Sequence, residues 1–245
     1  MKLSIIMPVY NESPTIREIV RRVAAVPLHK EIILVDDCST DETSAILDTV
    51  DVPGLRRLSH VTNRGKGAAI QTGLAAATGD VIVIQDADLE YEPQDLPRLL
   101  APIVAGQAQV VYGVRSFEGQ RWYMNLGNRF VTLVTNLLYG VRLRDMETCY
   151  KMMTRRVAER LQLESRRFDV EAELTAKILR QGCTIVEVPI HYHARHEQKK
   201  LTPLDGLPTL RALLKYRFWR PSQYIASADP QSQADRLESL SHDQL

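Results

Sequence analysis

VIVIQDADLEYEP, residues 81–93, connects a buried strand to a group of acids and guides the interpretation of the whole chain. Four apolar β-formers come first, and Asp86, Asp88 and Glu90 follow within five residues. Side chains alternate along an extended chain, so Asp86 and Asp88 should project from the same side, with Glu90 continuing the series. Carboxylates suit Mg²⁺ or Mn²⁺, which commonly link protein carboxylates to substrate phosphates. The stretch predicts a metal–diphosphate site; a solvated acidic turn is the alternative interpretation.

Strand and helix patterns alternate on both sides of this stretch. Alternation with short connections predicts an α/β fold with a mostly parallel central sheet flanked by helices. In such sheets, ligands collect at the carboxyl ends of the strands. The expected strands are 3–10, 31–37, 55–61, 80–88 and 108–115, and the expected helices are 14–26, 39–50, 65–79 and 94–106.

Polar residues converge on the expected carboxyl ends, which favours a ligand site over isolated solvated loops. The first strand ends at Pro8, Tyr10, Asn11 and Glu12, the second at Asp36 and Asp37, the fourth at Asp86, Asp88 and Glu90, and the fifth at Arg115.

The second half of the chain has a different pattern. An apolar-rich helix is expected over 122–140, helices over 157–161 and 170–182, and strands over 144–155 and 183–194. We expect a single domain over 1–220, with a nucleotide-sugar half (1–115) and an acceptor half (116–220). Residues 221–245 are polar without apolar periodicity, which predicts a disordered tail.

Composition excludes several classes of protein. The net charge of +1 leaves no molecule-wide basic surface, so we expect no nucleic acid partner. Three scattered cysteines without CxxC spacing favour a reducing compartment. The apolar run at the N-terminus is too short for a signal peptide, and no apolar stretch is long enough to span a membrane as a helix. The protein is expected in the cytoplasm, either free or on the cytoplasmic face of a membrane.

Four motifs in order, PVYNE (8–12), VDDCSTDET (35–43), NRGKGAAIQTG (63–73) and TGDVIVIQDADLEYEP (78–93), resemble the family 2 glycosyltransferases of type-A (GT-A) fold. The resemblance covers about residues 3–220 and is strongest to the dolichyl- and polyprenyl-phosphate sugar synthases. It implies an inverting, metal-dependent enzyme that moves a sugar from a nucleotide diphosphate sugar, of the GDP-mannose or UDP-glucose type, to a polyprenyl or dolichyl phosphate.

The resemblance also implies roles for individual residues on the donor side. Pro8, Tyr10 and Glu12 would line the nucleotide pocket, Asp37 would hold the nucleobase with Asp36 beside it, and Asp86 would approach both ribose and metal. Asp88 and Glu90 would ligate Mg²⁺ or Mn²⁺, although Glu90 stands where the family has Gln.

On the acceptor side the resemblance implies two arginines and a basic loop. Arg115 and Arg129 would bind phosphates, which planar guanidinium groups do bidentately; surface arginines are the alternative. Arg195, Lys199 and Lys200 match the basic loop of the family. Asp145 would lie near the sugar, which makes Asp86, Asp88, Arg115 and Asp145 the expected catalytic set.

Residues 191–220 carry seven basic and two acidic side chains, a local net charge of +5. Within it, the segment 204–220 combines four of these basic residues with an apolar face, as in helices that lie in a membrane interface. A helix packed on the domain with a solvated basic face is the alternative. Two other functions also stay open: a family 2 enzyme that glycosylates a saccharide hydroxyl, with Asp145 as general base, and a catalytically silent nucleotide-binding subunit.

Overall fold

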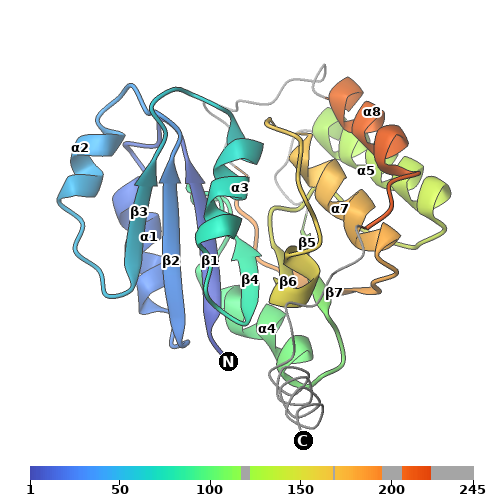
Figure 1. The fold of residues 1–245 in the computed structure, drawn as a ribbon, viewed down its shortest axis with the longest axis horizontal. Helices are drawn as coiled ribbons and strands as arrows, with labels where there is room; N and C mark the ends of the chain where they lie inside the picture. The colour runs from blue at the N-terminus through green and yellow to red at the C-terminus, as the bar shows by residue number, and fades with distance from the viewer. Residues whose placement is uncertain (117–121, 168, 195–205, 222–245) are drawn as a thin grey trace, which may run out of the picture.

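The computed structural model describes residues 1–116, 122–167, 169–194 and 206–221. Its centre is a seven-stranded sheet with the order β3-β2-β1-β4-β6-β5-β7 (Figure 1). Every pairing is parallel except those of β6, which runs antiparallel to both β4 and β5. The predicted α/β class and mostly parallel sheet are confirmed. The strands are β1 (Leu3–Val9), β2 (Lys30–Asp36), β3 (Leu55–Ser59), β4 (Val81–Ile84), β5 (Val110–Arg115), β6 (Lys151–Thr154) and β7 (Ile185–Ile190).

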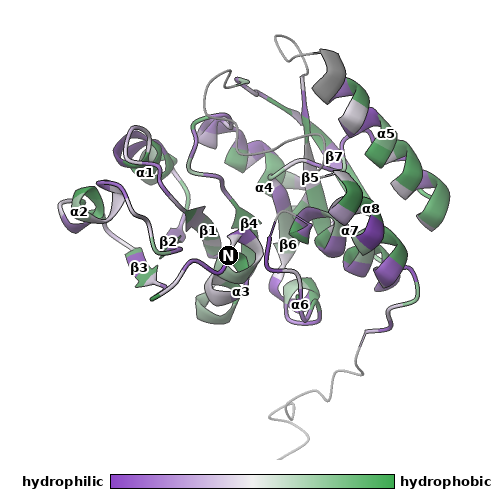
Figure 2. Ribbon diagram, turned by 90° about the horizontal axis from the view of Figure 1, so that it is seen from above, coloured by the Kyte–Doolittle hydropathy of each residue, from purple (hydrophilic) through white to green (hydrophobic). Residues whose placement is uncertain are grey.

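Helices cover both faces of the sheet (Figure 2). On one face lies α3, against β1 and β2, and on the other lies α4, against β5 and β6. Buried side chains at Ile16, Ile19, Val20 and Val23 follow the spacing of a helix with one apolar face, which explains how α1 packs on the sheet. The helices of this part are α1 (Ile16–Ala25), α2 (Thr43–Asp48), α3 (Lys66–Ala76), a 3₁₀ turn η1 (Pro93–Asp95) and α4 (Leu96–Val104).

A second group of helices stands beyond β6 at one side of the molecule (Figure 1). They share a small core of their own, built from Val131, Met146, Ala172, Leu213 and Tyr216 with two further alanines. These helices are α5 (Trp122–Tyr139), α7 (Val170–Arg180) and α8 (Gly206–Tyr216). The short helix α6 (Arg155–Ala158) follows β6, and its Val157 and Ala158 belong to the main core.

Several expected elements are shorter in the structure, and the helix expected over 157–161 is found as α6, Arg155–Ala158. Two of the differences have a visible cause. The strand expected over 144–155 is confined to β6, because residues 144–150 form a loop whose carbonyl groups bind the buried Lys151. The helix expected over 39–50 begins only at Thr43, since Asp36 accepts a hydrogen bond from the Ser39 backbone N–H and shapes a loop there. The expected disordered tail lies outside the described residues, apart from residue 221.

Candidate active site

Acidic side chains gather where β1 and β4, parallel neighbours, reach their carboxyl ends. Burial raises the pKa of Asp88 to about 7, and the negative charges of Asp86, Glu90 and Glu12 contribute to the same shift. Carboxylates raise one another's pKa in this way only when they lie close together. The structure therefore brings the acids that follow two separate strands into one group, and that group carries excess negative charge.

A turn, not an extended strand, brings Asp86, Asp88 and Glu90 together. β4 ends at Ile84, and Leu89 adopts a positive φ of 63°. The backbone N–H of Glu90 donates to Asp88 Oδ1 at 3.1 Å. Strand alternation through Glu90 was the wrong basis for expecting the acids on one side, because the backbone leaves the strand before the first acid.

Glu90 faces a partner of its own. The hydroxyl of Tyr192 donates to Glu90 Oε2 at 2.6 Å. Among the described residues, no group of three or more His, Cys, Asp or Glu side chains is arranged to hold a metal ion. Asp86 and Asp88 still offer the hard oxygen donors that Mg²⁺ prefers, and Mg²⁺ is commonly held by one or two carboxylates together with substrate phosphates. The residues fit a cation whose remaining ligands come from a diphosphate, and Glu90 as a third ligand stays a prediction.

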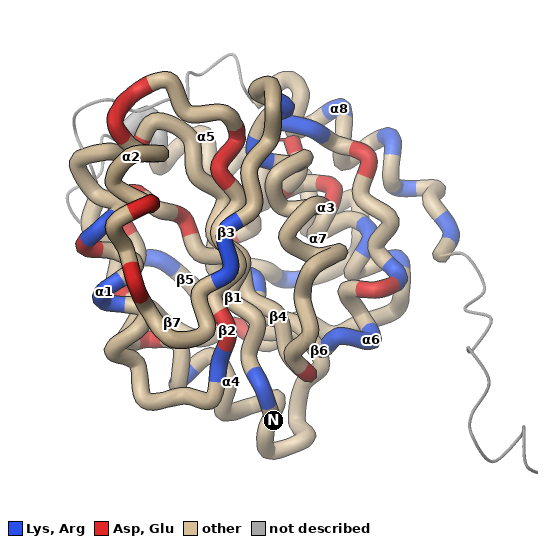
Figure 3. Tube along the Cα trace, turned by 60° about the vertical axis from the view of Figure 1, so that its left-hand side comes forward, with Lys and Arg blue, Asp and Glu red and all other residues tan. Residues whose placement is uncertain are grey.

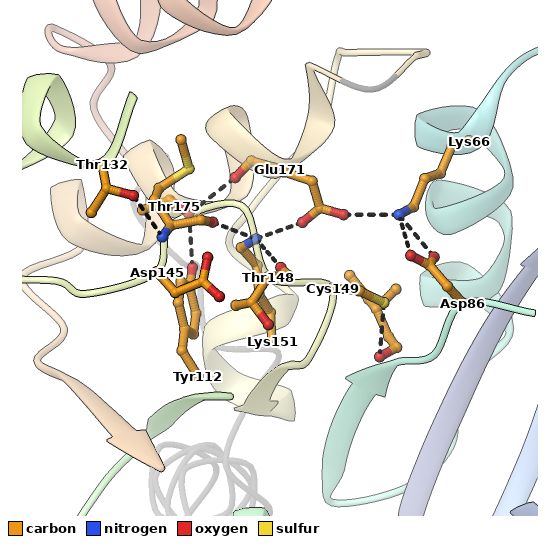
Figure 4. A network of polar contacts seen from close by, with 12 residues as sticks. Lys66, Asp86, Tyr112, Thr132, Asp145, Thr148, Cys149, Lys151, Glu171 and Thr175 are labelled. Carbon is orange, nitrogen blue, oxygen red and sulfur yellow. Dashed lines mark hydrogen bonds and ion pairs between the residues drawn. The ribbon is translucent and has the colours of Figure 1, made fainter. Parts of the chain in front are cut away.

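An alternating series of charges runs from the acid group into the second half of the molecule (Figure 4). Lys66 Nζ lies 2.8 Å from Asp86 Oδ1 and 3.1 Å from Glu171 Oε1. Glu171 Oε2 lies 2.6 Å from the ammonium of Lys151, whose side chain is fully buried. Asp86, Lys66, Glu171 and Lys151 thus form a chain of four charges that is neutral as a whole.

Two glycines allow the loop before α7 to lie directly on the start of α3. A Cβ atom at Gly67 would come within 2.2 Å of the Ser165 carbonyl oxygen, and one at Gly65 within 2.3 Å of the Arg166 carbonyl oxygen. The backbone N–H of Gly67 donates to that Arg166 oxygen at 2.8 Å. Because this contact fixes the first turn of α3, it also fixes Lys66 beside the acids.

Asp36 and Asp37, predicted for the nucleobase, organise loops in this structure. Both carboxylate oxygens of Asp37 bind the protein: Oδ1 accepts the Arg64 N–H at 2.8 Å, and Oδ2 accepts the Gly65 N–H at 2.6 Å. His60 Nδ1 also lies 2.6 Å from Asp37 Oδ1. Asp37 therefore shapes the loop that leads into α3, and direct contact with a base remains a prediction for both aspartates.

The residues after β1 lie at the same edge. Pro8 and Tyr10 are half-buried at the end of the strand, while Glu12 is buried. The Glu12 backbone N–H donates to the Thr43 hydroxyl at 2.9 Å, and its side chain accepts the Thr15 hydroxyl at 3.0 Å. These contacts hold the predicted nucleotide-lining segment against the start of α2.

Arg115 and Asp145 form a buried bidentate pair. Arg115 Nε donates to Asp145 Oδ2 at 2.7 Å, and Nη2 donates to Oδ1 at 2.8 Å. The guanidinium carbon lies 5.3 Å from the centre of the Tyr192 ring, within the range of a cation–π contact. Arg115 and Asp145, predicted for phosphate and sugar, are therefore next to each other and bind each other. Tyr192 contacts both Arg115 and Glu90 and so connects this pair to the acid group.

Of the remaining predicted phosphate ligands, the structure describes Arg129 alone. Arg129 is exposed on α5. Arg195, Lys199 and Lys200 lie outside the described residues.

Three residues of the site escaped the sequence reasoning. Lys66 was expected only to start a helix, and neither Glu171 nor Tyr192 belongs to any motif considered. Lys66 and Glu171 are 105 positions apart, and no local pattern connects them. The two close-packing glycines around Lys66 were the one available signal that another segment of the chain comes close there.

Comparison with known proteins gives one family match and several similar proteins. The family model described as glycosyl transferase family 2 matches residues 4–162. An undecaprenyl-phosphate 4-deoxy-4-formamido-L-arabinose transferase from Enterobacter sp. (strain 638) is 31% identical over 203 residues, which are 80% of this chain and 61% of that protein. The transferase of the same name from Sodalis glossinidius (strain morsitans) is 34% identical over 151 residues, 59% of this chain and 46% of that protein. The matched regions therefore cover less than two thirds of either relative.

Solved structures confirm the fold. Glucosyl-3-phosphoglycerate synthase from Mycobacterium tuberculosis, in complex with Mn²⁺, UDP-glucose and phosphoglyceric acid, superposes with a TM-score of 0.69 at 22% identity. The superposition covers 92% of this chain and 85% of that one. The complex of the same enzyme with UDP also gives a TM-score of 0.69, over 91% of this chain and 82% of that one.

Proposed function

The chain belongs to glycosyl transferase family 2, and on that premise we propose that it transfers a sugar from a nucleotide diphosphate sugar to a polyprenyl phosphate, with inversion at the anomeric carbon. The acid group around Asp88 is the observation that carries the proposal. Support comes from the position of Asp86, Asp88 and Glu90 after β4, at the edge of the sheet where such folds bind ligands, and from the pKa of Asp88, which burial and the charges of Asp86, Glu90 and Glu12 raise. Relatives named for transfer to undecaprenyl phosphate support the acceptor class.

The donor is proposed to be a UDP-sugar or a GDP-sugar. Support for a nucleotide diphosphate comes from the structural neighbours, which are described with UDP and with Mn²⁺ or Mg²⁺. Asp86 and Asp88 would hold the cation. When bound, Mg²⁺ or Mn²⁺ supplies Lewis-acid neutralisation of the departing diphosphate.

The chemistry of the acceptor removes the need for a strong general base. A phosphate oxygen is already anionic at neutral pH, whereas a saccharide hydroxyl must lose a proton during attack. Asp145, the candidate base for a hydroxyl acceptor, has both carboxylate oxygens bonded to Arg115. This pairing favours the phosphate acceptor over the hydroxyl-acceptor alternative.

Positioning two anionic substrates is then the main task of the protein. Arg129 and the loop residues Arg195, Lys199 and Lys200 are proposed to hold phosphate groups against their mutual repulsion. Arg115 is proposed to take part from its place beside Tyr192 and Asp145. Bringing reactants together in this way can supply a large share of a catalytic rate enhancement.

A surface on α5 and α8 offers a place for the lipid. On α5 the exposed side chains Leu126, Phe130, Leu133 and Leu137 recur at helical spacing on one face. Leu207 and Leu214 on α8, with Phe218 just after it, are also exposed. These seven are most of the ten large hydrophobic side chains exposed in the described part of the chain, so the apolar surface is concentrated rather than scattered.

The two helices pack against each other. The hydroxyl of Tyr139 on α5 donates to the Leu213 carbonyl oxygen on α8 at 2.7 Å. Figure 2 shows apolar residues along both helices, and Figure 3 shows basic residues along α8. On α5, on α8 and just after α8, the exposed basic side chains are Arg129, Arg211, Lys215 and Arg220.

Apolar side chains beside exposed arginines match the interface of an anionic bilayer. No helix in the described parts of the chain combines the length and the apolar character needed to span one. We therefore propose that α5 and α8 lie on the cytoplasmic face of a membrane, where the acceptor lipid is present.

A donor and acceptor panel tests the function directly. GDP-mannose, UDP-glucose and UDP-GlcNAc are offered with undecaprenyl phosphate, dolichyl phosphate or simple sugars, in the presence of Mg²⁺ or Mn²⁺. Asp88→Asn should lower turnover at least about 100-fold, because it removes a carboxylate from the cation site. Asp80→Asn is the matched control, since Asp80 accepts the Lys2 N–H at 2.7 Å on the opposite edge of the sheet.

Three results would contradict the proposal. Equal turnover of wild-type protein and a folded Asp88→Asn variant would exclude the role of the acid group. Transfer to simple sugars, with none to polyprenyl phosphates, would favour the hydroxyl-acceptor alternative. Binding of nucleotide and metal without any transfer would favour the catalytically silent subunit.

A further inference from the structure

Lys66 occupies a carboxylate that the proposed cation also needs. Its ammonium lies 2.8 Å from Asp86 Oδ1 and 3.0 Å from Asp86 Oδ2, so it covers both oxygens. The Lys66 side chain is 15% exposed and begins α3, which leaves it at the border between the site and solvent. In the structure without substrate, Asp86 is therefore already neutralised by a residue of the chain itself.

Glu171 is a second carboxylate with which Lys66 can pair. Glu171 Oε1 is buried and already pairs with Lys66 Nζ at 3.1 Å, a longer contact than the 2.8 Å from Lys66 to Asp86. Glu171 itself is held in place by Lys151, which also donates to the carbonyl oxygens of Met146 at 2.9 Å and Thr148 at 2.5 Å. A small movement of Lys66 from Asp86 toward Glu171 would shorten this second contact and keep the buried ammonium paired.

The Lys66 ammonium lies against two carboxylates, 2.8 Å from Asp86 Oδ1 and 3.1 Å from Glu171 Oε1. Its positive charge beside Asp86 repels a second cation. Bare metal ions therefore meet both an occupied ligand and a like charge.

We propose that Lys66 is the resident counter-cation of Asp86 and competes with the divalent cation, so that the cation binds strongly only together with the nucleotide diphosphate. The diphosphate provides the ligands that two carboxylates lack and adds negative charge that compensates for Lys66. Glu171 keeps Lys66 paired once Asp86 is released. Lys66 is thus a positioning residue that couples metal binding to donor binding, and the inference rests on the cation site of the proposed function.

The test measures metal binding and not turnover. Mn²⁺ is titrated into the full chain with and without UDP or GDP, and free Mn²⁺ is followed by electron paramagnetic resonance. Lys66→Met should tighten Mn²⁺ binding without nucleotide about tenfold, the effect of removing one close charge interaction. The increase in Mn²⁺ affinity on adding nucleotide should be smaller in Lys66→Met than in the wild type.

Two more variants complete the experiment. Lys2→Met is the matched control, because it removes an ammonium that pairs with Glu31 at 2.8 Å at the far edge of the sheet. Its Mn²⁺ affinity should equal that of the wild type. Lys66→Gln removes the same charge with a smaller change in polarity, and it replaces Lys66→Met if circular dichroism shows that variant to be unfolded.

The outcomes separate this inference from the function on which it rests. If wild-type protein binds Mn²⁺ with nucleotide but the folded Lys66 variants bind Mn²⁺ alone no better than wild type, the counter-cation role is refuted and the cation site stands. If wild-type protein binds no Mn²⁺ even with nucleotide, the cation site and the role of Lys66 fail together. Tighter binding of Mn²⁺ alone in the Lys66 variants, with no change in Lys2→Met, supports the inference.

Discussion

Removing two apolar side chains from the α5–α8 surface should release the protein from membranes. Leu137 is 76% exposed and Phe218 is 81% exposed, so neither contributes much to the folded core. Full burial of such a side chain is worth about 1.5–3 kcal/mol, which leaves about 1–2 kcal/mol for each residue to gain at a bilayer interface. The double variant Leu137→Ser, Phe218→Ser should therefore bind vesicles about 30-fold more weakly or worse, at about 1.4 kcal/mol per factor of ten.

Vesicle sedimentation measures this effect, with anionic and with neutral vesicles at low and high salt. Val61→Ser is the matched control, because Val61 is 94% exposed but follows β3, away from both helices. Binding to anionic vesicles should also weaken as salt increases, since exposed basic residues each contribute about 1 kcal/mol near such a surface. Equal binding by the double variant and the wild type, or equal loss in Val61→Ser, would refute the assignment of this surface.

Three further predictions concern stability. Lys177→Met should lower the free energy of unfolding in urea by about 3–5 kcal/mol, because Lys177 and Glu173 are both fully buried and pair at 2.6 Å; a loss below 1 kcal/mol would contradict it. Gly67→Ala should cost about 1–3 kcal/mol or more, because its Cβ would meet the Ser165 carbonyl oxygen at 2.2 Å, and an unchanged melting temperature would refute that contact. Burial alone would raise the pKa of Glu31, but its hydrogen bonds lower it from 4.5 to about 2, so its contribution is complete above about pH 5 and is lost as the pH falls toward 2. The deficit of Glu31→Gln, about 3 kcal/mol at pH 7, should therefore disappear over that range, and a pH-independent deficit would argue against it.

The fold could be predicted because its signals are local. Apolar runs such as 31–37 and 80–88 are bounded by polar residues, and parallel strands place their carboxyl ends at one edge. That rule alone predicts that Glu12 lies at the same edge as Asp86 and Asp88, and the charge of Glu12 contributes to the raised pKa of Asp88. The rule does not predict the positive φ of Leu89. The same spacing of acids is compatible with an extended strand end and with a turn.

The contact partners of the predicted residues could not be predicted from the sequence, because these contacts depend on packing between distant segments. Arg115 and Asp145 were both predicted for the site, but their bidentate pairing depends on how the loop after α5 lies beside β5. Tyr192 stands near the end of β7 and reaches Glu90 across the sheet edge. Sequence patterns identify which side chains are polar and near a strand end, but they do not show which of them neutralise one another.

The ion network also changes how the two halves of the chain should be regarded. A division at residue 115 separates donor from acceptor motifs, yet β6 from the second half inserts between β4 and β5 of the first. Glu171 lies beyond residue 162, where the match to the family model ends, and still pairs with the lysine that covers Asp86. Since α7 carries Glu171 and also packs against α8, the helix that supports the proposed membrane surface also carries the carboxylate that pairs with Lys66 beside Asp86. A displacement of α7 would therefore alter the surroundings of Asp86 and α8 together, which couples the two halves of the chain although their motifs are separate in sequence.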